Sequence, residues 1–217
     1  MDPRRARLTR IIRYFFVAAA AILAACPRAE AAKLAPGLYA SLKTSKGAII
    51  CRLFDDKTPA AVRNFGQLAQ GVTSWVDPES GKRVKKKFYD GLSFYKVVPG
   101  GFVETGDPLN DGTGGPGFTF PDEILPDLKF DRPGRLALAN DGKPGANGSR
   151  FFITVKALPE FDGKYTIFGQ VVGGQNAVDR ISKVKADEKK KPIKSVILES
   201  VEIFRVEEPA SPKPKTK

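Results

Sequence analysis

The sequence predicts a mainly β domain, either a barrel or a sandwich, that also carries two helices. Between residues 88 and 172, short aromatic-rich runs alternate with Gly and Pro, and the chain contains 21 Gly, 17 Pro and 15 Phe. Short strands separated by frequent turns are typical of antiparallel β architectures. Hydrophobic residues make up 41% and charged residues 28% of the 217 positions. A domain of about 170 residues can bury a core of this kind without covalent cross-links.

The first expected elements are a hairpin and a helix. Residues 38–54 contain two strand-like runs around Ser45-Lys46-Gly47, a pattern that predicts a β-hairpin. A helix is expected to begin at Thr58 and Pro59, with Thr58 as its N-cap, and to end at Gly71. The apolar positions with helical spacing in this segment are Ala61, Phe65 and Leu68.

Three further segments complete the domain. Residues 73–87 are polar, turn-rich and basic, which predicts a surface excursion. Residues 175–184 have the pattern of a second, shorter helix, and residues 194–206 have that of a closing strand. The β domain is therefore expected to span residues 38–206.

The two ends of the chain differ from the domain. Residues 1–25 have the pattern of an export signal, since five Arg precede a run of twelve apolar residues, Tyr14 to Ala25. That run is too short to span a bilayer, which takes about 20 residues. Residues 26–37 are expected to form a linker, and residues 207–217 a disordered basic tail. We therefore expect an exported protein of the periplasm or cell envelope.

Two processing outcomes are consistent with the end of the apolar run. Leu23-Ala24-Ala25-Cys26 resembles a bacterial lipobox, which would make Cys26 a lipidated N-terminus. Ala29-Glu30-Ala31 is an A-x-A site, and cleavage after Ala31 would release a soluble protein. In the first case the protein would contact a membrane only through its lipid anchor.

Composition excludes several function classes. The chain has no His and two Cys, so it lacks the commonest general base and does not support a zinc site. The net charge is +12, but the lysine runs at 85–87 and 189–191 have no interleaved aromatic residues and are interpreted as solvated loops. We expect no nucleic-acid partner, a monomer, and a buried, unreactive Cys51.

A series of motifs makes the sequence similar to a known family. Their order and joint spacing over about residues 40–205 resemble those of cyclophilins, the exported bacterial members in particular. The motifs are Thr44-Ser45-Lys46-Gly47, Phe88-Tyr89-Asp90-Gly91, Gly106-Asp107-Pro108, Phe120-Pro121-Asp122-Glu123, Leu138-Ala139-Asn140, Gly148-Ser149-Arg150-Phe151-Phe152-Ile153-Thr154 and Phe161-Asp162-Gly163-Lys164-Tyr165. The resemblance implies a closed eight-stranded antiparallel β-barrel capped by two helices. It also implies peptidyl-prolyl cis-trans isomerase activity without a cofactor.

Such a reaction requires neither a base nor a nucleophile. Partial double-bond character gives the peptide bond a rotational barrier of about 18–20 kcal/mol. A site that holds the proline ring and favours a twisted amide lowers this barrier. A donor aimed at the proline nitrogen helps, because the nitrogen lone pair leaves the carbonyl in the twisted state. The expected partners are X-Pro segments of unfolded or extended polypeptides.

The resemblance also assigns site residues, and some of them depart from the family pattern. Phe152 takes the place of the central pocket residue, Ala139 and Asn140 lie where the substrate chain is held, and Lys96 replaces the catalytic arginine. Glu104 replaces a glutamine that accompanies this arginine. The remaining substrate-binding candidates are Phe102, Asp141, Arg150, Phe161 and Tyr165.

The departures leave two functions open. Lys96 is a mobile, hydrated point charge where a planar guanidinium is usual. One hypothesis is an isomerase of reduced activity that assists the folding of exported proteins. The alternative is a proline-binding or chaperone module whose turnover is weak or absent.

Overall fold

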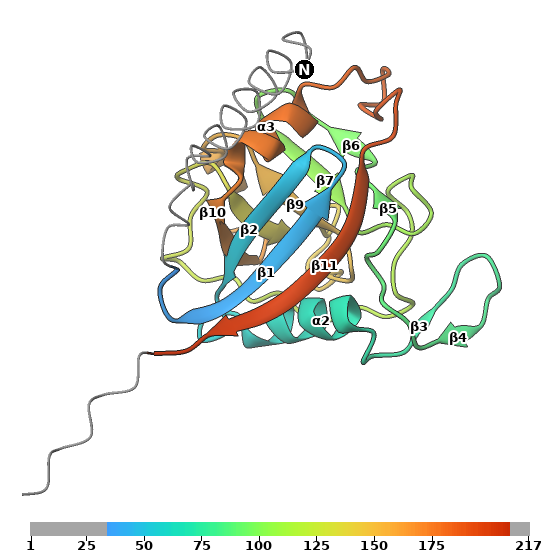
Figure 1. Cartoon of the computed structure of the whole chain (residues 1–217), viewed down its shortest axis with the longest axis horizontal. Helices are drawn as coiled ribbons and strands as arrows, with labels where there is room; N and C mark the ends of the chain where they lie inside the picture. Colours follow the sequence, from blue (N-terminus) through green and yellow to red (C-terminus); the bar gives the residue numbers. More distant parts are fainter. Residues whose placement is uncertain (1–33, 209–217) are drawn as a thin grey trace, which may run out of the picture. The chain divides into compact units, whose positions relative to one another are not determined.

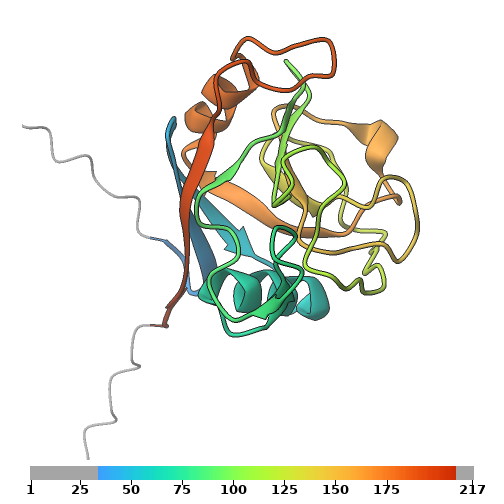
Figure 2. The same cartoon turned by 90° about the vertical axis from the view of Figure 1, so that its right-hand side faces the viewer.

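The computed structural model describes residues 34–208, and these form a curled antiparallel sheet with two helices (Figures 1 and 2). The elements are β1 (Gly37–Thr44), β2 (Gly47–Leu53), α2 (Pro59–Gln70), β3 (Trp75–Val76), β4 (Arg83–Val84), β5 (Leu92–Ser93), β6 (Lys96–Val97), β7 (Phe102–Thr105), β8 (Arg135–Leu138), β9 (Phe151–Thr154), the 3-10 helix η1 (Pro159–Phe161), β10 (Ile167–Gly173), α3 (Gln175–Ser182) and β11 (Ile197–Val206). The helices α2 and α3 lie at opposite ends of the sheet in both views.

The main sheet has nine strands in the order β5-β11-β1-β2-β10-β8-β9-β7-β6, and β3 and β4 form a separate two-stranded sheet. The expected mainly β fold with two helices is confirmed. Closure of an eight-stranded barrel stays a prediction, because pairing in the described residues begins at β5 and ends at β6 and the sheet curls into a half-barrel.

The predicted hairpin is confirmed as β1 and β2, which pair from Leu38 opposite Leu53 to Thr44 opposite Gly47. The Thr44 hydroxyl closes the turn, since it donates to the Gly47 carbonyl oxygen at 2.6 Å and accepts from the Lys46 amide at 3.1 Å. Cys51, in β2, is fully buried as expected, and burial raises the pKa of its thiol to about 12.

The predicted first helix is confirmed as α2, with Pro59 in its first turn and Gly71 in the left-handed conformation at its end. Thr58 occupies the N-cap position as predicted, but its side chain makes no cap hydrogen bond. Instead, the Glu123 carboxylate accepts from the amides of Ala60 at 3.1 Å and Ala61 at 2.8 Å. A distant loop thus supplies the negative charge that the helix N-terminus favours.

The bounds of the remaining elements differ by a few residues from the predicted ones. The second helix ends at Ser182, and the closing strand begins at Ile197. The excursion at 73–87 is anchored, not simply exposed, because Trp75 is buried against Phe88 at a ring-centroid distance of 4.7 Å. The signal peptide, Cys26, most of the linker and residues 209–217 of the tail lie outside the described residues and stay predictions. Among the described residues, no helix is both long enough and apolar enough to cross a membrane.

Strand β9 separates two hydrophobic clusters. Successive side chains of a strand point to opposite faces of a sheet, so Phe151 joins the main core against Phe65 and Tyr89. Phe152 joins a smaller cluster with Phe130 and other aromatic rings. This smaller cluster forms the base of the candidate site.

Candidate functional site

Aromatic rings from three parts of the chain form a small pocket. Phe102 lies on β7, Phe152 on the adjacent β9, Phe161 at the end of η1, and Tyr165 just before β10. Ring centroids are 5.4 Å apart for Phe102 and Phe152, and 5.3 Å apart for Phe152 and Tyr165. Phe161 lies 5.8 Å from both Phe102 and Phe152. The pocket has a volume of about 90 Å³, and its other lining residues are Lys96, Glu104, Ala139 and Asp141.

Phe130 supports this pocket from below and was not found by sequence reasoning. Its ring is fully buried and stacks on Phe152 at 5.7 Å with an interplanar angle of 15°. The Asp162 carboxylate accepts from the Phe130 amide at 2.7 Å and fixes the segment. Phe130 stands in a charged stretch that carries no recognised motif, so only its apolar character among polar neighbours could have indicated it.

A cation lies at the edge of the aromatic pocket. Lys96 on β6 is directly opposite Glu104 on β7 in the strand register. The Lys96 Nζ is 3.8 Å from Glu104 Oε2 and 5.5 Å from the centre of the Phe102 ring. The Lys96 side chain is 44% exposed and that of Glu104 is 7% exposed. The ammonium can therefore reach a ligand in the pocket while the carboxylate stays in place.

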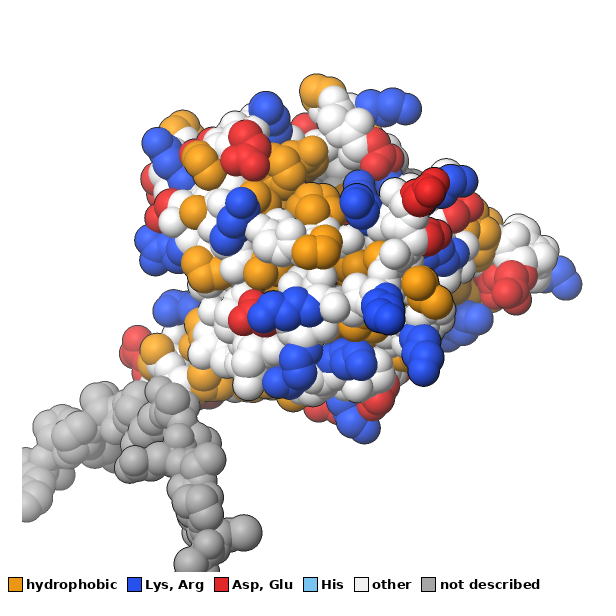
Figure 3. All heavy atoms as spheres, turned by 90° about the horizontal axis from the view of Figure 1, so that it is seen from above, with side chains coloured by type: hydrophobic (Ala, Val, Ile, Leu, Met, Phe, Trp, Pro, Cys, Tyr) orange, Lys and Arg blue, Asp and Glu red, His pale blue; other side chains and the backbone are white. Residues whose placement is uncertain are grey.

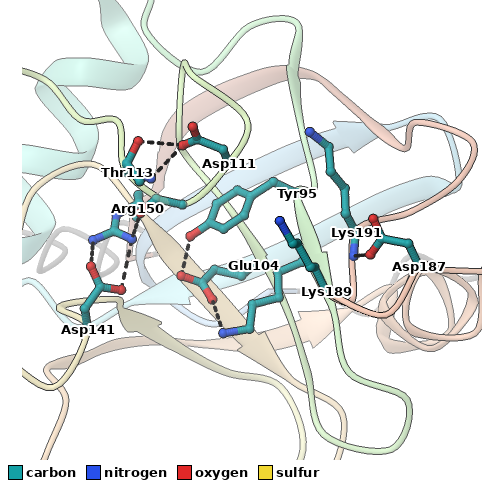
Figure 4. A pocket seen from close by; sticks show the side chains of 11 residues that line it. Tyr95, Glu104, Asp111, Thr113, Asp141, Arg150, Asp187, Lys189 and Lys191 are labelled. Atoms are coloured by element: carbon teal, nitrogen blue, oxygen red, sulfur yellow. Dashed lines mark hydrogen bonds and ion pairs between the residues drawn. The ribbon is translucent and has the colours of Figure 1, made fainter.

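Tyr95 orients Glu104, and its role was missed in the sequence. The buried Tyr95 hydroxyl donates a hydrogen bond to Glu104 Oε1, which leaves Oε2 on the side of Lys96 (Figure 4). Burial raises the pKa of Tyr95, and the Glu104 charge raises it further, so the phenol stays protonated as a donor. The neighbouring position of Tyr95 beside Lys96 in the sequence was the one available signal.

Arg150 and Asp141 form a second charged pair at the site. Both Arg150 guanidinium amines contact the Asp141 carboxylate, one of them at 3.0 Å, and Arg150 also donates to the Gly112 carbonyl oxygen. Burial disfavours the charged guanidinium, but the hydrogen bond and charge of Asp141 raise the pKa of Arg150 overall. Of the two cations considered for Glu104, the ion pair in the structure is with Lys96, and Arg150 is instead held by Asp141.

A buried carboxylate shapes the loop that receives Arg150. Asp107 is fully buried and accepts hydrogen bonds from the amides of Leu109 at 2.8 Å, Asp111 at 3.1 Å and Gly112 at 2.5 Å. These bonds fix the backbone whose Gly112 carbonyl contacts Arg150. The Gly106-Asp107-Pro108 motif thus has a structural role beside the site.

The other two predicted residues, Ala139 and Asn140, lie in different parts of the site. The Ala139 amide donates to the Arg150 carbonyl oxygen at 3.0 Å, and Ala139 lines the aromatic pocket. Asn140 is buried, and its amide group bonds Asp122 and the Lys164 carbonyl, both at 3.3 Å. Asn140 lines a neighbouring hollow of about 480 Å³ with Asp141 and Arg150 instead of the aromatic pocket. The structure therefore brings all ten predicted residues of the site into one region.

The protonation of Glu104 provides a test of this geometry. Burial raises the pKa of Glu104, while the hydrogen bond from Tyr95 and the charge of Lys96 act against this. The folded protein therefore holds the proton more tightly than the unfolded chain, and the free energy of unfolding falls as pH rises through the Glu104 pKa. We expect Glu104→Gln to remove this loss. The free energy of unfolding of the variant minus that of wild type should therefore be larger at about pH 8 than at about pH 4. Urea unfolding at both pH values measures the difference.

Glu202→Gln on the exposed face of β11 is the matched control for the loss of one carboxylate. A Glu104→Gln variant whose stability relative to wild type is the same at both pH values would show that Glu104 is not a desolvated carboxylate.

The sheet with an aromatic pocket and a cation beside it is the arrangement expected of a protein that binds proline-containing peptides. Residues 39–203 match the family model described as cyclophilin type peptidyl-prolyl cis-trans isomerase/CLD. The chain belongs to the cyclophilin-type peptidyl-prolyl cis-trans isomerase family.

Individual relatives agree with this assignment. The chain is 46% identical over 171 residues to peptidyl-prolyl cis-trans isomerase B of Streptomyces anulatus, which covers 77% of this chain and 97% of the relative. It is 42% identical over 166 residues to peptidyl-prolyl cis-trans isomerase A of Mycobacterium tuberculosis, covering 76% and 91%. A crystal structure of a Cryptosporidium parvum cyclophilin type isomerase in the presence of the dipeptide Ala-Pro matches with a TM-score of 0.66 and 33% identity, covering 77% and 99%.

Proposed function

We propose that this chain catalyses cis-trans isomerisation of X-Pro peptide bonds, with the proline ring in the aromatic pocket and Lys96 as the catalytic cation. The observation that carries the proposal is the position of the Lys96 ammonium above the Phe102 ring, at the mouth of a pocket lined by Phe152, Phe161 and Tyr165. The Cryptosporidium parvum relative determined with Ala-Pro supports a proline ligand.

The geometry suits a twisted amide. An apolar pocket excludes water from the proline ring and holds one side of the bond still. When the bond twists, the nitrogen lone pair no longer delocalises into the carbonyl and becomes an acceptor. The Lys96 ammonium is positioned to donate to it, and this interaction is stronger in the twisted state than in the planar ones. Glu104, held by Tyr95, keeps the ammonium near the pocket without a short contact, since the pair is 3.8 Å apart.

A protease-free exchange measurement tests the proposal. Two-dimensional exchange NMR on a short peptide with one X-Pro bond reports interconversion that is otherwise slow, on the scale of tens to hundreds of seconds. We expect catalytic amounts of the protein to produce exchange cross-peaks between the cis and trans isomers. Chemical shift changes in Phe102 and Phe152 without exchange would instead support a binding module.

That second function rests on a specific observation. Lys96 is shared between solvent and Glu104, and a lysine ammonium has no planar fork to fix its direction. A site of this kind can bind proline peptides yet stabilise the twisted state poorly. The two functions therefore differ in turnover and not in ligand.

We further propose that the chain is exported to the periplasm or cell envelope and acts there on other exported polypeptides. The Arg-rich, apolar pattern of residues 1–25 supports export, and the lipobox at Cys26 supports a lipid anchor. We expect Cys26→Ser either to block processing, so that the uncleaved precursor accumulates, or to move cleavage to Ala31, so that the mature protein shifts from the membrane fraction to the soluble one. Mass spectrometry and fractionation measure both. Unchanged mature mass and location would refute lipidation and favour cleavage after Ala31.

A further inference from the structure

A short lysine-bearing loop lies against the strand that carries Lys96. The Val97 amide on β6 donates to the Lys190 carbonyl oxygen at 2.8 Å, so the loop backbone is hydrogen-bonded to the last strand of the sheet. Within the loop, the Lys190 amide donates to Asp187 at 3.0 Å and the Asp187 amide to Lys191 at 2.9 Å, and Lys190 adopts a left-handed φ of 68°. These bonds fix the backbone positions of Lys189 and Lys191.

The loop closes one side of a hollow that adjoins the aromatic pocket. The hollow has a volume of about 610 Å³ and shares Lys96, Glu104 and Asp141 with that pocket. Lys189 and Lys191 line it from the loop, on the side opposite Arg150 (Figure 4). It is therefore large enough to receive a side chain of a peptide whose proline occupies the aromatic pocket.

The carboxylates of the hollow are already engaged by its own donors. Asp141 holds Arg150, and Asp111 accepts from the hydroxyl of Thr113 at 2.6 Å and from its amide at 2.8 Å. Asp187 accepts from the Lys191 amide at 2.8 Å. These bonds hold the three carboxylates in place, and none of the three forms an ion pair with Lys189 within residues 34–208.

The lysine ammonium groups of the hollow differ in how many partners they have. Lys191 Nζ donates to the Asn110 carbonyl oxygen at 2.7 Å, whereas the Lys189 ammonium makes no hydrogen bond or ion pair with residues 34–208. Lys96 has only the 3.8 Å contact with Glu104. The donors of Lys96 and Lys189 thus face the same hollow with room for an anionic partner.

We propose that this hollow is a subsite for an acidic side chain, Asp or Glu, of the peptide whose proline lies in the aromatic pocket. The proposal rests on the function proposed above and adds a sequence preference to it. The ammonium of Lys189, on the loop, and that of Lys96, at the edge of the aromatic pocket, would both attract the carboxylate of this side chain. The rigid turn lowers the entropy cost of presenting Lys189, since its backbone is fixed before the peptide binds.

Paired peptides test this subsite. Each peptide has one X-Pro bond. One residue, at any of the three positions before or the three positions after that bond, is Glu in one member of the pair and the isosteric Gln in the other. We expect Glu to bind about three- to fivefold more tightly than Gln at one position, a range typical of exposed ion pairs. NMR titration of the protein gives both dissociation constants, and the preference should weaken in about 1 M salt because salt screens exposed charges.

Variants separate this subsite from the general basic character of the surface. Lys and Arg side chains gather over the face that carries α3 and the loop (Figure 3). Because their summed charge could also favour Glu peptides, a control variant is needed. We expect Lys189→Ala to bring the Glu-to-Gln ratio near one and Lys189→Glu to reverse it. Lys185→Ala changes the net charge equally, but Lys185 is exposed and does not line the hollow, so it should keep the preference.

The outcomes distinguish this subsite from the proposed function itself. Binding of the Gln peptides with no preference for Glu at any position would refute the subsite and leave the proposed function intact. A Glu preference that survives Lys189→Ala, or that Lys185→Ala removes equally, would also refute it. If neither member of any pair binds, the proposed function fails and the subsite fails with it.

Discussion

We expect Phe152→Ala to cost about 3–5 kcal/mol in the free energy of unfolding, the range for a buried Phe reduced to Ala. The side chain is 3% exposed and its ring contacts those of Phe102, Phe130, Phe161 and Tyr165. Removing the ring leaves a cavity that the stacked Phe130 cannot fill without leaving its own position. The same change should greatly weaken binding of an X-Pro peptide, because the base of the pocket is lost. Urea unfolding and NMR titration at low temperature measure the two effects.

Phe151 is a matched control from the same strand. It is also buried, but it faces the main core against Phe65, Tyr89 and Phe168. We expect Phe151→Ala to lose a similar amount of stability and to keep its affinity for the peptide while folded. Equal affinity of the two folded variants would show that Phe152 is part of the scaffold only. Phe152→Leu provides the same comparison if the alanine variant does not fold.

We expect Lys96→Met to lower kcat/KM for isomerisation about ten- to a hundredfold. A hydrogen bond from a charged donor contributes about 1.5–3 kcal/mol, and each 1.36 kcal/mol in the barrier is about tenfold in rate. Met retains an apolar stem beside Phe102, so the variant removes the charge and keeps the packing. Peptide affinity should change little, because the interaction forms in the twisted state.

The exposed Lys156, just after β9, is a control for the loss of one positive charge, and Lys156→Met should keep wild-type turnover. Wild-type kcat/KM in Lys96→Met would exclude Lys96 as the catalytic cation.

The Lys96 and Glu104 positions should also be coupled. Lys96→Arg alone leaves Glu104 free to hold the new guanidinium in a bidentate pair, away from the peptide. Glu104→Gln keeps an acceptor for the Tyr95 hydroxyl and removes the competing charge. We convert each change in kcat/KM into a change in activation free energy. We expect the gain of the double variant to exceed the sum of the two single gains, as for residues in contact. Additive effects would show that the two side chains act independently.

Much of the fold could be predicted because its signals are local. The hairpin at 38–54 depends on alternation and a turn, and α2 depends on Pro59, Gly71 and the spacing between them. The cap of α2 could not be predicted in this way. Thr58 has the right chemistry, but Glu123, 65 positions further along the chain, takes the role because the fold brings its carboxylate to the helix end.

The candidate site shows the same division. The resemblance to the family identified the aromatic residues Phe102, Phe152, Phe161 and Tyr165 and the substitution at Lys96, because each position corresponds to a residue of the family pattern. Pairings between charged groups depend on separations of a few ångströms between strands distant in sequence, and only the tertiary structure decided them. It assigned Lys96 to Glu104 through the β6–β7 register and Arg150 to Asp141, buried Tyr95 as the donor to Glu104, and placed Phe130 under the pocket. The sequence predicted that the lysine run at 189–191 is solvated. The tertiary structure brings Lys189 and Lys191 to the edge of the site, because a hydrogen bond from Val97 on β6 to the Lys190 carbonyl holds that loop beside the strand.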